Sequence, residues 1–259
     1  MRIYSILWIN SIYLVYIQNT MSKGILITYD GSFPGFLSIA FAARLQKLSV
    51  DAIKPVDQHS ESLLFQEHQH IPTRMRDAKE IWELLGGISL ETQRYVYFSF
   101  LSERSELQIE LYKYVQLVMQ EGSTSWEALF EIKEQLSPWA QRVGTEKGYL
   151  ERHMKFSKTP SGIHYSEIKP IYNVLPLLTR HCRNRFKKEL WAIYDTRRGF
   201  GLRNLNGQIV RFIRPNNAAP AKDIPKEVAR KNTGNQKSVP SSPFSHGKHP
   251  KRPSLRVSA

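Results

Sequence analysis

Apolar and polar positions follow a strand period at the start of the chain, a helical period in the middle and a strand period again later. A continuous apolar run at residues 24–29 predicts a buried strand. Asp30-Gly31-Ser32 then combines turn chemistry with a capping residue, so a helix is expected over residues 33–47. The polar stretch 51–72 predicts irregular structure, and the pair of histidines in His68-Gln69-His70 would need a third ligand to hold a metal.

Helical periodicity dominates the middle of the chain, where apolar residues recur three and four positions apart. Helices are expected over residues 78–85, 90–101, 107–118, 126–136 and 138–150. Gly86-Gly87 is expected to end the first of them, and Pro138 to start the last. The aromatic residues on these helices have core spacing, so no cofactor is assigned to them.

The pattern returns to strands after the helical middle. Strands are expected at residues 152–156 and 163–168, a short helix over 174–186, and a hairpin over 191–202. The expected fold is therefore α+β: an N-terminal strand-turn-helix, a helical middle, and a C-terminal antiparallel sheet with one inserted helix.

The charge of the chain points to an anionic partner. The net charge is +14 and the isoelectric point about 9.8, which favours nucleic acid or an acidic membrane surface. Residues 216–259 hold nine Lys/Arg against two Asp/Glu, a net +7, and are rich in Pro, Ser and Asn. A disordered basic tail is therefore expected there, and the remainder of the chain is only moderately basic.

The two ends bracket one expected domain at residues 21–215. The apolar run at residues 3–17 is interrupted by Asn10-Ser11 and is short for a membrane span, so residues 1–20 are interpreted as an upstream extension before Met21. No membrane association is expected. Cys182 is the single cysteine, which favours a reducing, cytoplasmic location and excludes a cysteine-ligated cluster or a cysteine-rich zinc site.

The hairpin over residues 191–202 carries the most distinctive chemistry. Its turn places Asp195 beside two guanidinium groups, Arg197 and Arg198, and Gly199 suits a tight turn. Arginine binds phosphate oxygens through parallel hydrogen bonds, so the turn is a candidate phosphate contact. A solvated hairpin turn without a binding role remains the alternative.

Four motifs together resemble one family. They are Thr28-Tyr29-Asp30-Gly31-Ser32-Phe33 with Gly35-Phe36; Leu101-Ser102-Glu103; Tyr165-Ser166-Glu167-Ile168-Lys169-Pro170 with Asn173-Val174-Leu175-Pro176-Leu177; and Trp191-Ala192-Ile193-Tyr194-Asp195 with Arg197-Arg198 and Gly201-Leu202. In this order and spacing they resemble an uncharacterised family associated with DNA repair and DNA metabolism. Its members are typically encoded beside a radical-SAM protein related to spore photoproduct lyase, and some are fused to a uracil-DNA glycosylase domain.

The chain departs from that family at one place. Gly148 stands where the family has a histidine, and His153 lies on the following expected strand instead. Lys155 and Phe156 match the basic and aromatic positions of that strand. A catalytic role for the family histidine would therefore not carry over to this chain.

The resemblance implies a nucleic-acid-binding accessory protein that works with a radical-SAM enzyme on DNA. Arg197 and Arg198, aided by Lys155 and Arg152, would bind phosphates, and Tyr165 or Phe200 would stack on an exposed base. The alternative is a hydrolase or glycosylase that acts on nucleic acid through Asp30 and Asp195 as general base and orienting group. A third possibility is an interaction module for an acidic protein partner.

Overall fold

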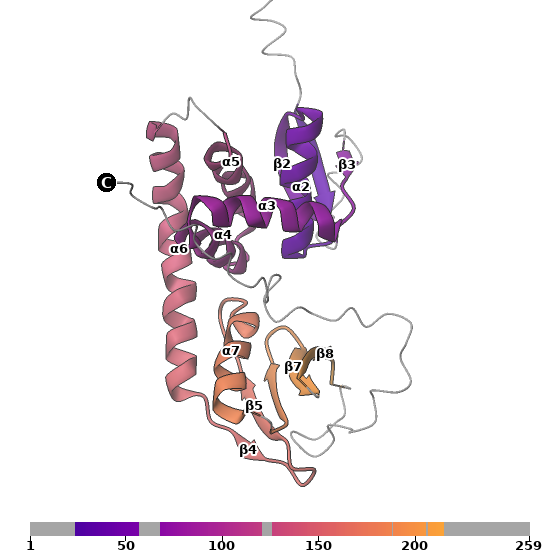
Figure 1. The fold of residues 1–259 in the computed structure, drawn as a ribbon, viewed down its shortest axis with the longest axis vertical. Helices are drawn as coiled ribbons and strands as arrows, with labels where there is room; N and C mark the ends of the chain where they lie inside the picture. Colours follow the sequence, from indigo (N-terminus) through magenta and orange to yellow (C-terminus); the bar gives the residue numbers. More distant parts are fainter. Residues whose placement is uncertain (1–23, 57–67, 121–125, 188, 206, 215–259) are drawn as a thin grey trace, which may run out of the picture. The chain divides into compact units, whose positions relative to one another are not determined.

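The computed structural model describes residues 24–56, 68–120, 126–187, 189–205 and 207–214 (Figure 1). These residues form two compact units, unit 1 up to Gly144 and unit 2 from Thr145 onward, and each is described by itself. The expected upstream extension (1–20) and basic tail (216–259) lie outside the described residues. One domain over 21–215 stays a prediction.

Unit 1 contains a parallel sheet with the strand order β2-β1-β3 in its described part. The central strand β1 (Ile25–Tyr29) pairs with β2 (Val50–Pro55) and with β3 (His68–His70). The expectation of irregular structure over residues 51–72 is therefore wrong at both ends, and residues 57–67 lie outside the described ranges. Pairing with β1 satisfies the backbone groups of segments whose own sequence is polar, which a sequence pattern does not reveal.

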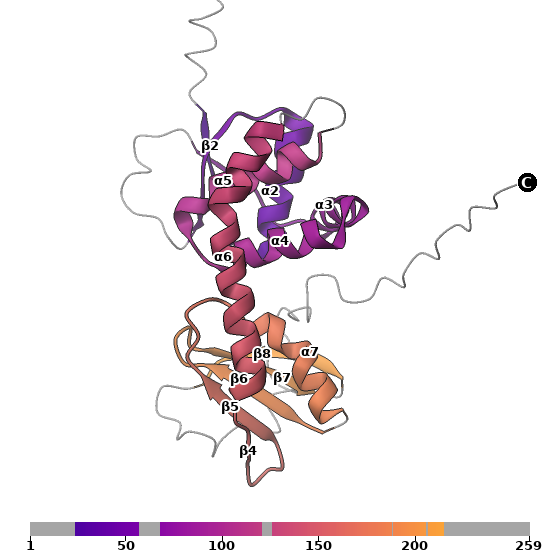
Figure 2. The same ribbon diagram turned by 90° about the vertical axis from the view of Figure 1, so that its left-hand side faces the viewer.

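The helices of unit 1 follow the predicted order. They are α2 (Phe33–Gln46), α3 (Met75–Ile88), α4 (Leu90–Leu101), the 3-10 turn η3 (Ser105–Leu107) and α5 (Gln108–Val118). The α2 helix packs against α3 and α5 (Figure 2). It begins as predicted, because the Ser32 hydroxyl accepts a hydrogen bond from the Gly35 amide at 3.0 Å.

The glycine pair in α3 does not end the helix. A Cβ atom on Gly86 would lie 2.5 Å from Nε2 of Gln93, a side chain of α4 whose amide donates to the Trp82 carbonyl. Gly86 therefore permits the close approach of Gln93 to the end of α3 instead of marking the helix terminus.

The α6 helix, Trp126–His153, joins segments that the sequence had separated. Pro138 lies inside this helix and does not start a new one. Proline removes one backbone hydrogen-bond donor at this position, and the helix continues on both sides of it. The expected strand over residues 152–156 is also wrong. Residues up to His153 are helical, and the strand β4 is only Ser157–Lys158.

Unit 2 contains a mixed sheet with the strand order β4-β5-β6-β7-β8 in its described part. The strands after β4 are β5 (His164–Ile168), β6 (Trp191–Asp195), β7 (Phe200–Leu205) and β8 (Gln208–Phe212), and the helix α7 (Leu175–Phe186) lies between β5 and β6 in sequence. The α7 helix returns the chain to the edge of the sheet where β5 begins, so β6 starts at the same edge and runs parallel to β5. The expected purely antiparallel sheet is corrected in this one pair.

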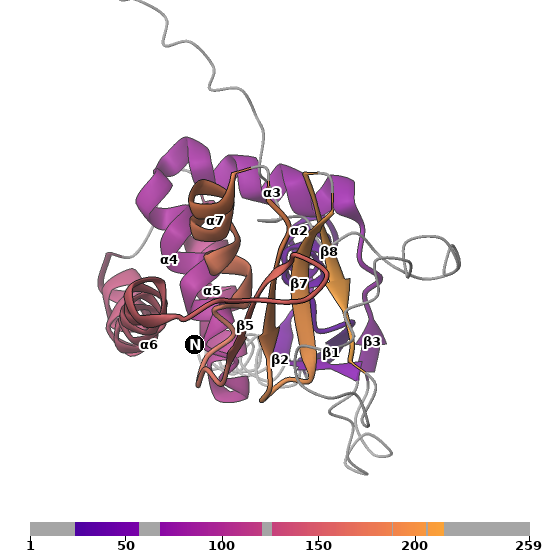
Figure 3. The same cartoon turned by 90° about the horizontal axis from the view of Figure 1, so that it is seen from below.

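The α7 helix lies on one side of this sheet, against β6 and β7 (Figure 3). Its buried face includes Leu178 and Cys182, and the β6 strand that it contacts contains the fully buried Trp191 and Ile193. The opposite face of the helix carries polar residues.

The α+β class predicted from the sequence is confirmed, with a small parallel sheet first and a mixed sheet second. No helix within the described residues is long and apolar enough to cross a membrane.

Candidate nucleic-acid interface

The two units differ sharply in charge. Residues 1–144 contain thirteen Lys/Arg and sixteen Asp/Glu, a net charge of −3, whereas residues 145–214 contain fifteen Lys/Arg and five Asp/Glu, a net charge of +10. Of the fourteen basic side chains that the structure describes in unit 2, nine are exposed. The positive charge of the described chain is therefore concentrated in unit 2.

All five carboxylates of residues 145–214 are described, and each already has a partner within unit 2. Glu151 pairs with Lys147 at 2.7 Å and Glu189 with His164 at 2.7 Å. The other three are Glu146, Glu167 and Asp195, whose partners are given below. The carboxylates of unit 2 are therefore all engaged within unit 2 itself.

One basic region combines cations with aromatic rings at the β4 edge of the sheet. We call it the β4–α7 patch: Lys155, Lys158 and Arg185 with the rings of Phe156 and Phe186. The Arg185 guanidinium lies 5.3 Å and 5.4 Å from the two ring centroids, and the rings contact each other edge to face at 4.6 Å. The rings hold the exposed Arg185 in place by cation–π attraction.

His164 joins this patch from β5. Its ring stacks on Phe186 at 4.4 Å, and its Nε2 contacts the Glu189 carboxylate. This hydrogen bond lowers the pKa of Glu189 below its usual value. Lys158 is the strand partner of His164 in the β4–β5 ladder, so its side chain lies on the same side of the sheet.

The outer face of α7 is a second basic surface, which sequence reasoning did not single out. We call it the α7 stripe: Arg180, Arg183, Asn184 and Lys187. Arg180, Arg183 and Asn184 lie within about 100° of the helix circumference, and Lys187 directly follows the last helical residue, with a φ of 47°. Arg180, Asn184 and Lys187 are exposed and Arg183 is partly exposed. The i, i+3, i+4, i+7 pattern in an acid-free sequence was the signal that could have found them.

The hairpin aspartate has a structural role. Asp195 is fully buried. Its Oδ1 accepts the backbone N–H groups of Arg197 at 2.9 Å and Arg198 at 3.1 Å, and its Oδ2 accepts Arg198 Nη1 at 2.9 Å. Gly199 has a φ of 68°, as expected for the tight turn. Both carboxylate oxygens are therefore used to shape the turn.

The two hairpin arginines have different surroundings. The Arg198 guanidinium also donates to the backbone carbonyls of Pro170 at 3.4 Å and Ile171 at 3.0 Å. It fastens the loop before α7 to the hairpin, so it is not an open phosphate ligand. Arg197 is exposed, and its role as a phosphate ligand stays a prediction.

Glu146 from α6, which sequence reasoning did not single out, holds the same loop from its other side. Its Oε1 accepts the Ile171 N–H at 2.7 Å and its Oε2 the Tyr172 N–H at 2.8 Å. Together with Arg198, this brings three separate stretches of the sequence to the carboxyl ends of β5 and β6. The two motifs at residues 165–177 and 191–202 are in contact at this edge of the sheet, through the hydrogen bonds of Arg198 to Pro170 and Ile171.

Tyr165 does not present an open ring for stacking. It is 4% exposed, its hydroxyl donates to Glu167 Oε1 at 2.7 Å, and Arg214 donates to the same hydroxyl at 3.2 Å. Arg214 also pairs directly with Glu167. Burial and the hydrogen bond to Glu167 raise the pKa of Tyr165. The predicted stacking role of Tyr165 is corrected, because the ring packs against Tyr194 and Ala192 in a buried cluster.

The structure divides the predicted phosphate ligands between two places. Lys158 lies beside His164 at the start of β5, while Arg197 follows Asp195 at the end of β6. Four strand residues, roughly 13 Å, separate these two ends. Lys155 is exposed two residues before β4. Arg152 is exposed on the last turn of α6, where a Cβ on Gly148 would lie 3.5 Å from its Nη1.

Asp30 belongs to unit 1, at the turn between β1 and α2. Its Oδ1 accepts the backbone N–H of Ser32 at 3.0 Å and the Ser32 hydroxyl at 2.6 Å. A Cβ atom on Gly35 would come within 2.3 Å of the same oxygen, so glycine is required for this close approach. Asp30 is exposed and shapes the start of α2.

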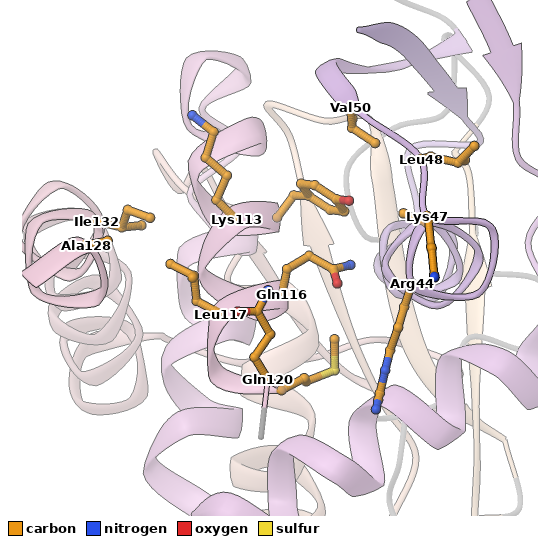
Figure 4. A pocket seen from close by; sticks show the side chains of 13 residues that line it. Arg44, Lys47, Leu48, Val50, Lys113, Gln116, Leu117, Gln120, Ala128 and Ile132 are labelled. Carbon is orange, nitrogen blue, oxygen red and sulfur yellow. The ribbon is translucent and has the colours of Figure 1, made fainter. Parts of the chain in front are cut away.

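Unit 1 also contains a pocket of about 860 Å³ between the end of α2, β2, α5 and α6 (Figure 4). Its lining is mixed: apolar residues such as Leu117 and Ile132, and the cations Arg44, Lys47 and Lys113. Lys113 is engaged with Glu110 at 2.9 Å.

No cluster of three or more His, Cys, Asp or Glu side chains that could hold a metal occurs in the described part of the chain. Cys182 is fully buried, and this burial raises the pKa of its thiol to about 12. The thiol therefore stays protonated and poorly nucleophilic near neutral pH.

A family model, DUF4130 (a domain of unknown function), matches residues 105–235, just over half of the chain. The match includes Arg152, Lys155, the α7 stripe and the hairpin arginines, whereas Asp30 lies outside it. A search of curated proteins found no match.

Proposed function

The chain belongs to the DUF4130 family, and we propose that it binds nucleic acid through the basic surface of unit 2. The observation that carries this proposal is the charge of unit 2. Its fifteen cations face five carboxylates, each of which has an internal partner. Such an excess attracts a polyanion and releases the counterions that surround it.

The β4–α7 patch is the proposed phosphate contact. Lys155 and Lys158 provide flexible point charges, and Arg185 provides a guanidinium that the two phenylalanine rings hold against the surface. A guanidinium restrained in this way loses little conformational freedom when it binds a phosphate oxygen. Arg197 contributes a further cation from the other end of the sheet.

The proposed biological role follows from the resemblance to the DNA-repair and DNA-metabolism family. In that role the chain is a cytoplasmic accessory that brings DNA to a radical-SAM enzyme. The partner enzyme would supply the cluster chemistry, since the single cysteine of this chain is a buried and protonated thiol.

The hydrolase or glycosylase alternative gains nothing from the geometry. It requires Asp195 as an open base or orienting group, but both oxygens of this buried carboxylate are bonded within the hairpin. We therefore favour binding over catalysis.

Fluorescence anisotropy with labelled DNA across a salt series tests the proposal. In the full chain, Lys155→Gln with Lys158→Gln is expected to weaken binding about tenfold at low salt and to reduce the salt slope by about two. Lys79→Gln with Lys113→Gln removes the same charge from unit 1 and serves as the matched control. Every variant carries the same basic tail, so the tail does not account for a difference between them.

Equal loss of affinity in the two double variants would contradict the proposal, because binding would then depend on net charge and not on the patch. Absence of salt-dependent binding by the unsubstituted chain would contradict it as well.

A further inference from the structure

We propose that α7 enters the major groove of duplex DNA, with the α7 stripe toward the base pairs. This inference rests on the proposed nucleic-acid binding and specifies its substrate and its contacting element. No residue of the stripe was among the ligands predicted from the sequence.

The first argument is the division of α7 into two faces. Leu175, Leu178, Cys182 and Phe186 are buried against the sheet and fix the helix in orientation. The helical residues of the stripe occupy the other face, where Arg180 and Asn184 are about 6 Å apart along the helix axis, and Lys187 follows the end of the helix. The B-DNA major groove is about 12 Å wide and admits one α-helix, so a supported helix with an exposed polar face has the required shape.

The second argument is the chemistry of the stripe. Arginine can donate two hydrogen bonds to the O6 and N7 atoms of guanine, and asparagine can pair with the N6 and N7 atoms of adenine. Arg180, Arg183 and Asn184 therefore carry donors and acceptors suited to base edges. Lys187 at the end of the stripe suits a phosphate.

The third argument is charge complementarity around the helix. Residues 168–188 contain six Lys/Arg and no Asp or Glu. Arg185 of the β4–α7 patch lies on the last turn of the same helix, so phosphates that flank the groove would meet cations. The nearest carboxylate in sequence, Glu189, lies two residues beyond Lys187 and is paired with His164 at 2.7 Å.

Duplex DNA fits better than the other nucleic acids. The major groove of A-form RNA is too narrow and deep for side chains to read. Recognition of single strands relies on exposed aromatic rings. Unit 2 has one such ring in Tyr149, which is 54% exposed on α6 and stacks on His153. The α7 helix offers none, because its Phe186 is 7% exposed.

The test uses the full chain and two labelled probes of equal length, a random-sequence duplex of about 20 base pairs and the matching single strand. Arg180→Gln with Arg183→Gln is expected to weaken duplex binding at least tenfold, and more than the Lys79→Gln, Lys113→Gln control. Circular dichroism verifies that each variant is folded. Methyl green, which binds the major groove, is expected to displace the protein, and netropsin, which binds the minor groove, is not.

Asn184→Ala separates a contact to the bases from simple charge attraction, because it changes a side chain in the stripe without changing the net charge. It is expected to weaken duplex binding about fivefold while the salt slope remains unchanged, because no cation is lost.

Three results would overturn the inference while leaving the proposed function intact. These are tighter binding of the single strand, displacement by netropsin but not by methyl green, and α7 variants that behave like the control. Loss of the difference between the Lys155/Lys158 variant and its control would instead reject the proposed function itself.

Discussion

Unit 1 and unit 2 use their carboxylates in opposite ways. In unit 1, ion pairs such as Lys79–Glu83 have both side chains about two-thirds exposed, and such pairs contribute little to stability. In unit 2, Asp195 is buried and Glu146 accepts two backbone N–H groups. The average charge of the chain conceals this difference, because the acidic unit partly cancels the basic one.

The two candidate catalytic aspartates give the sharpest form of the contrast. Asp30 follows β1 and Asp195 is the last residue of β6, and each accepts the backbone N–H of the residue two positions later. Asp30 is exposed, whereas Asp195 is fully buried and bonded to a guanidinium. The same turn hydrogen bond is therefore expected to contribute different amounts to the free energy of unfolding in the two units.

The largest expected effect tests this contrast. Asp195→Ala is expected to lower the free energy of unfolding by about 3 kcal/mol or more, because the largely buried Arg198 guanidinium loses its counter-ion and two amides lose their acceptor. Asp30→Ala is expected to cost only about 1 kcal/mol, as for loss of an exposed capping group. Urea denaturation of both full-length variants measures the two values. Similar losses would show that burial does not distinguish the two turns.

A second comparison concerns two glycines. A Cβ atom on Gly201 of β7 would lie 2.4 Å from the Phe212 ring and 2.6 Å from the Ile193 carbonyl oxygen, so Gly201→Ala is expected to cost about 2 kcal/mol of stability. Gly87 in α3 has open space around it. Gly87→Ala is therefore expected to stabilise unit 1 by up to about 1 kcal/mol.

Thermal denaturation of the two alanine variants tests whether Gly201→Ala lowers stability and Gly87→Ala raises it. Stability unchanged by Gly201→Ala would mean that Phe212 moves aside without cost, and the packing of β7 against β8 would need revision.

The last prediction concerns the loss of stability at alkaline pH. Burial raises the pKa of Cys182 in unit 2 from 9.0 to about 12. Because the folded state holds this proton more tightly, its contribution to stability is complete below pH 9 and declines as the pH rises toward 12. The loss at pH 10 is expected to be about 1.4 kcal/mol.

In unit 1, burial raises the pKa of Tyr95 from 10.0 to about 12 and also raises the pKa values of Tyr97, Tyr112 and Tyr114. The contribution of these tyrosines to stability should begin to decline only above pH 10. Limited proteolysis at pH 8 and at pH 9.8, with the fragments mapped by mass spectrometry, would show which unit opens first. Cys182→Ser removes the titrating thiol and is expected to flatten the response of unit 2. Earlier cleavage in unit 1 would contradict this assignment.

The sequence predicted much of the fold where local chemistry decides it. The Ser32 cap and the following apolar face predicted α2 almost to the residue, and the runs at residues 163–168 and 174–186 predicted β5 and α7. It failed at Pro138 and at residues 152–156, where the continuous helix α6 overrides a local stop signal. It also missed β2 and β3, which are strands because they pair with β1.

For the candidate interface, the sequence by itself determined the chemical inventory: an excess of cations, one cysteine, and the paired arginines of the hairpin. Only the tertiary structure decided which of these groups face outward. Arg198 and Tyr165 are held inside by partners distant in sequence, whereas Arg197 is left exposed. Burial and hydrogen bonding depend on contacts between residues far apart along the chain, and spacing within one segment does not encode those contacts.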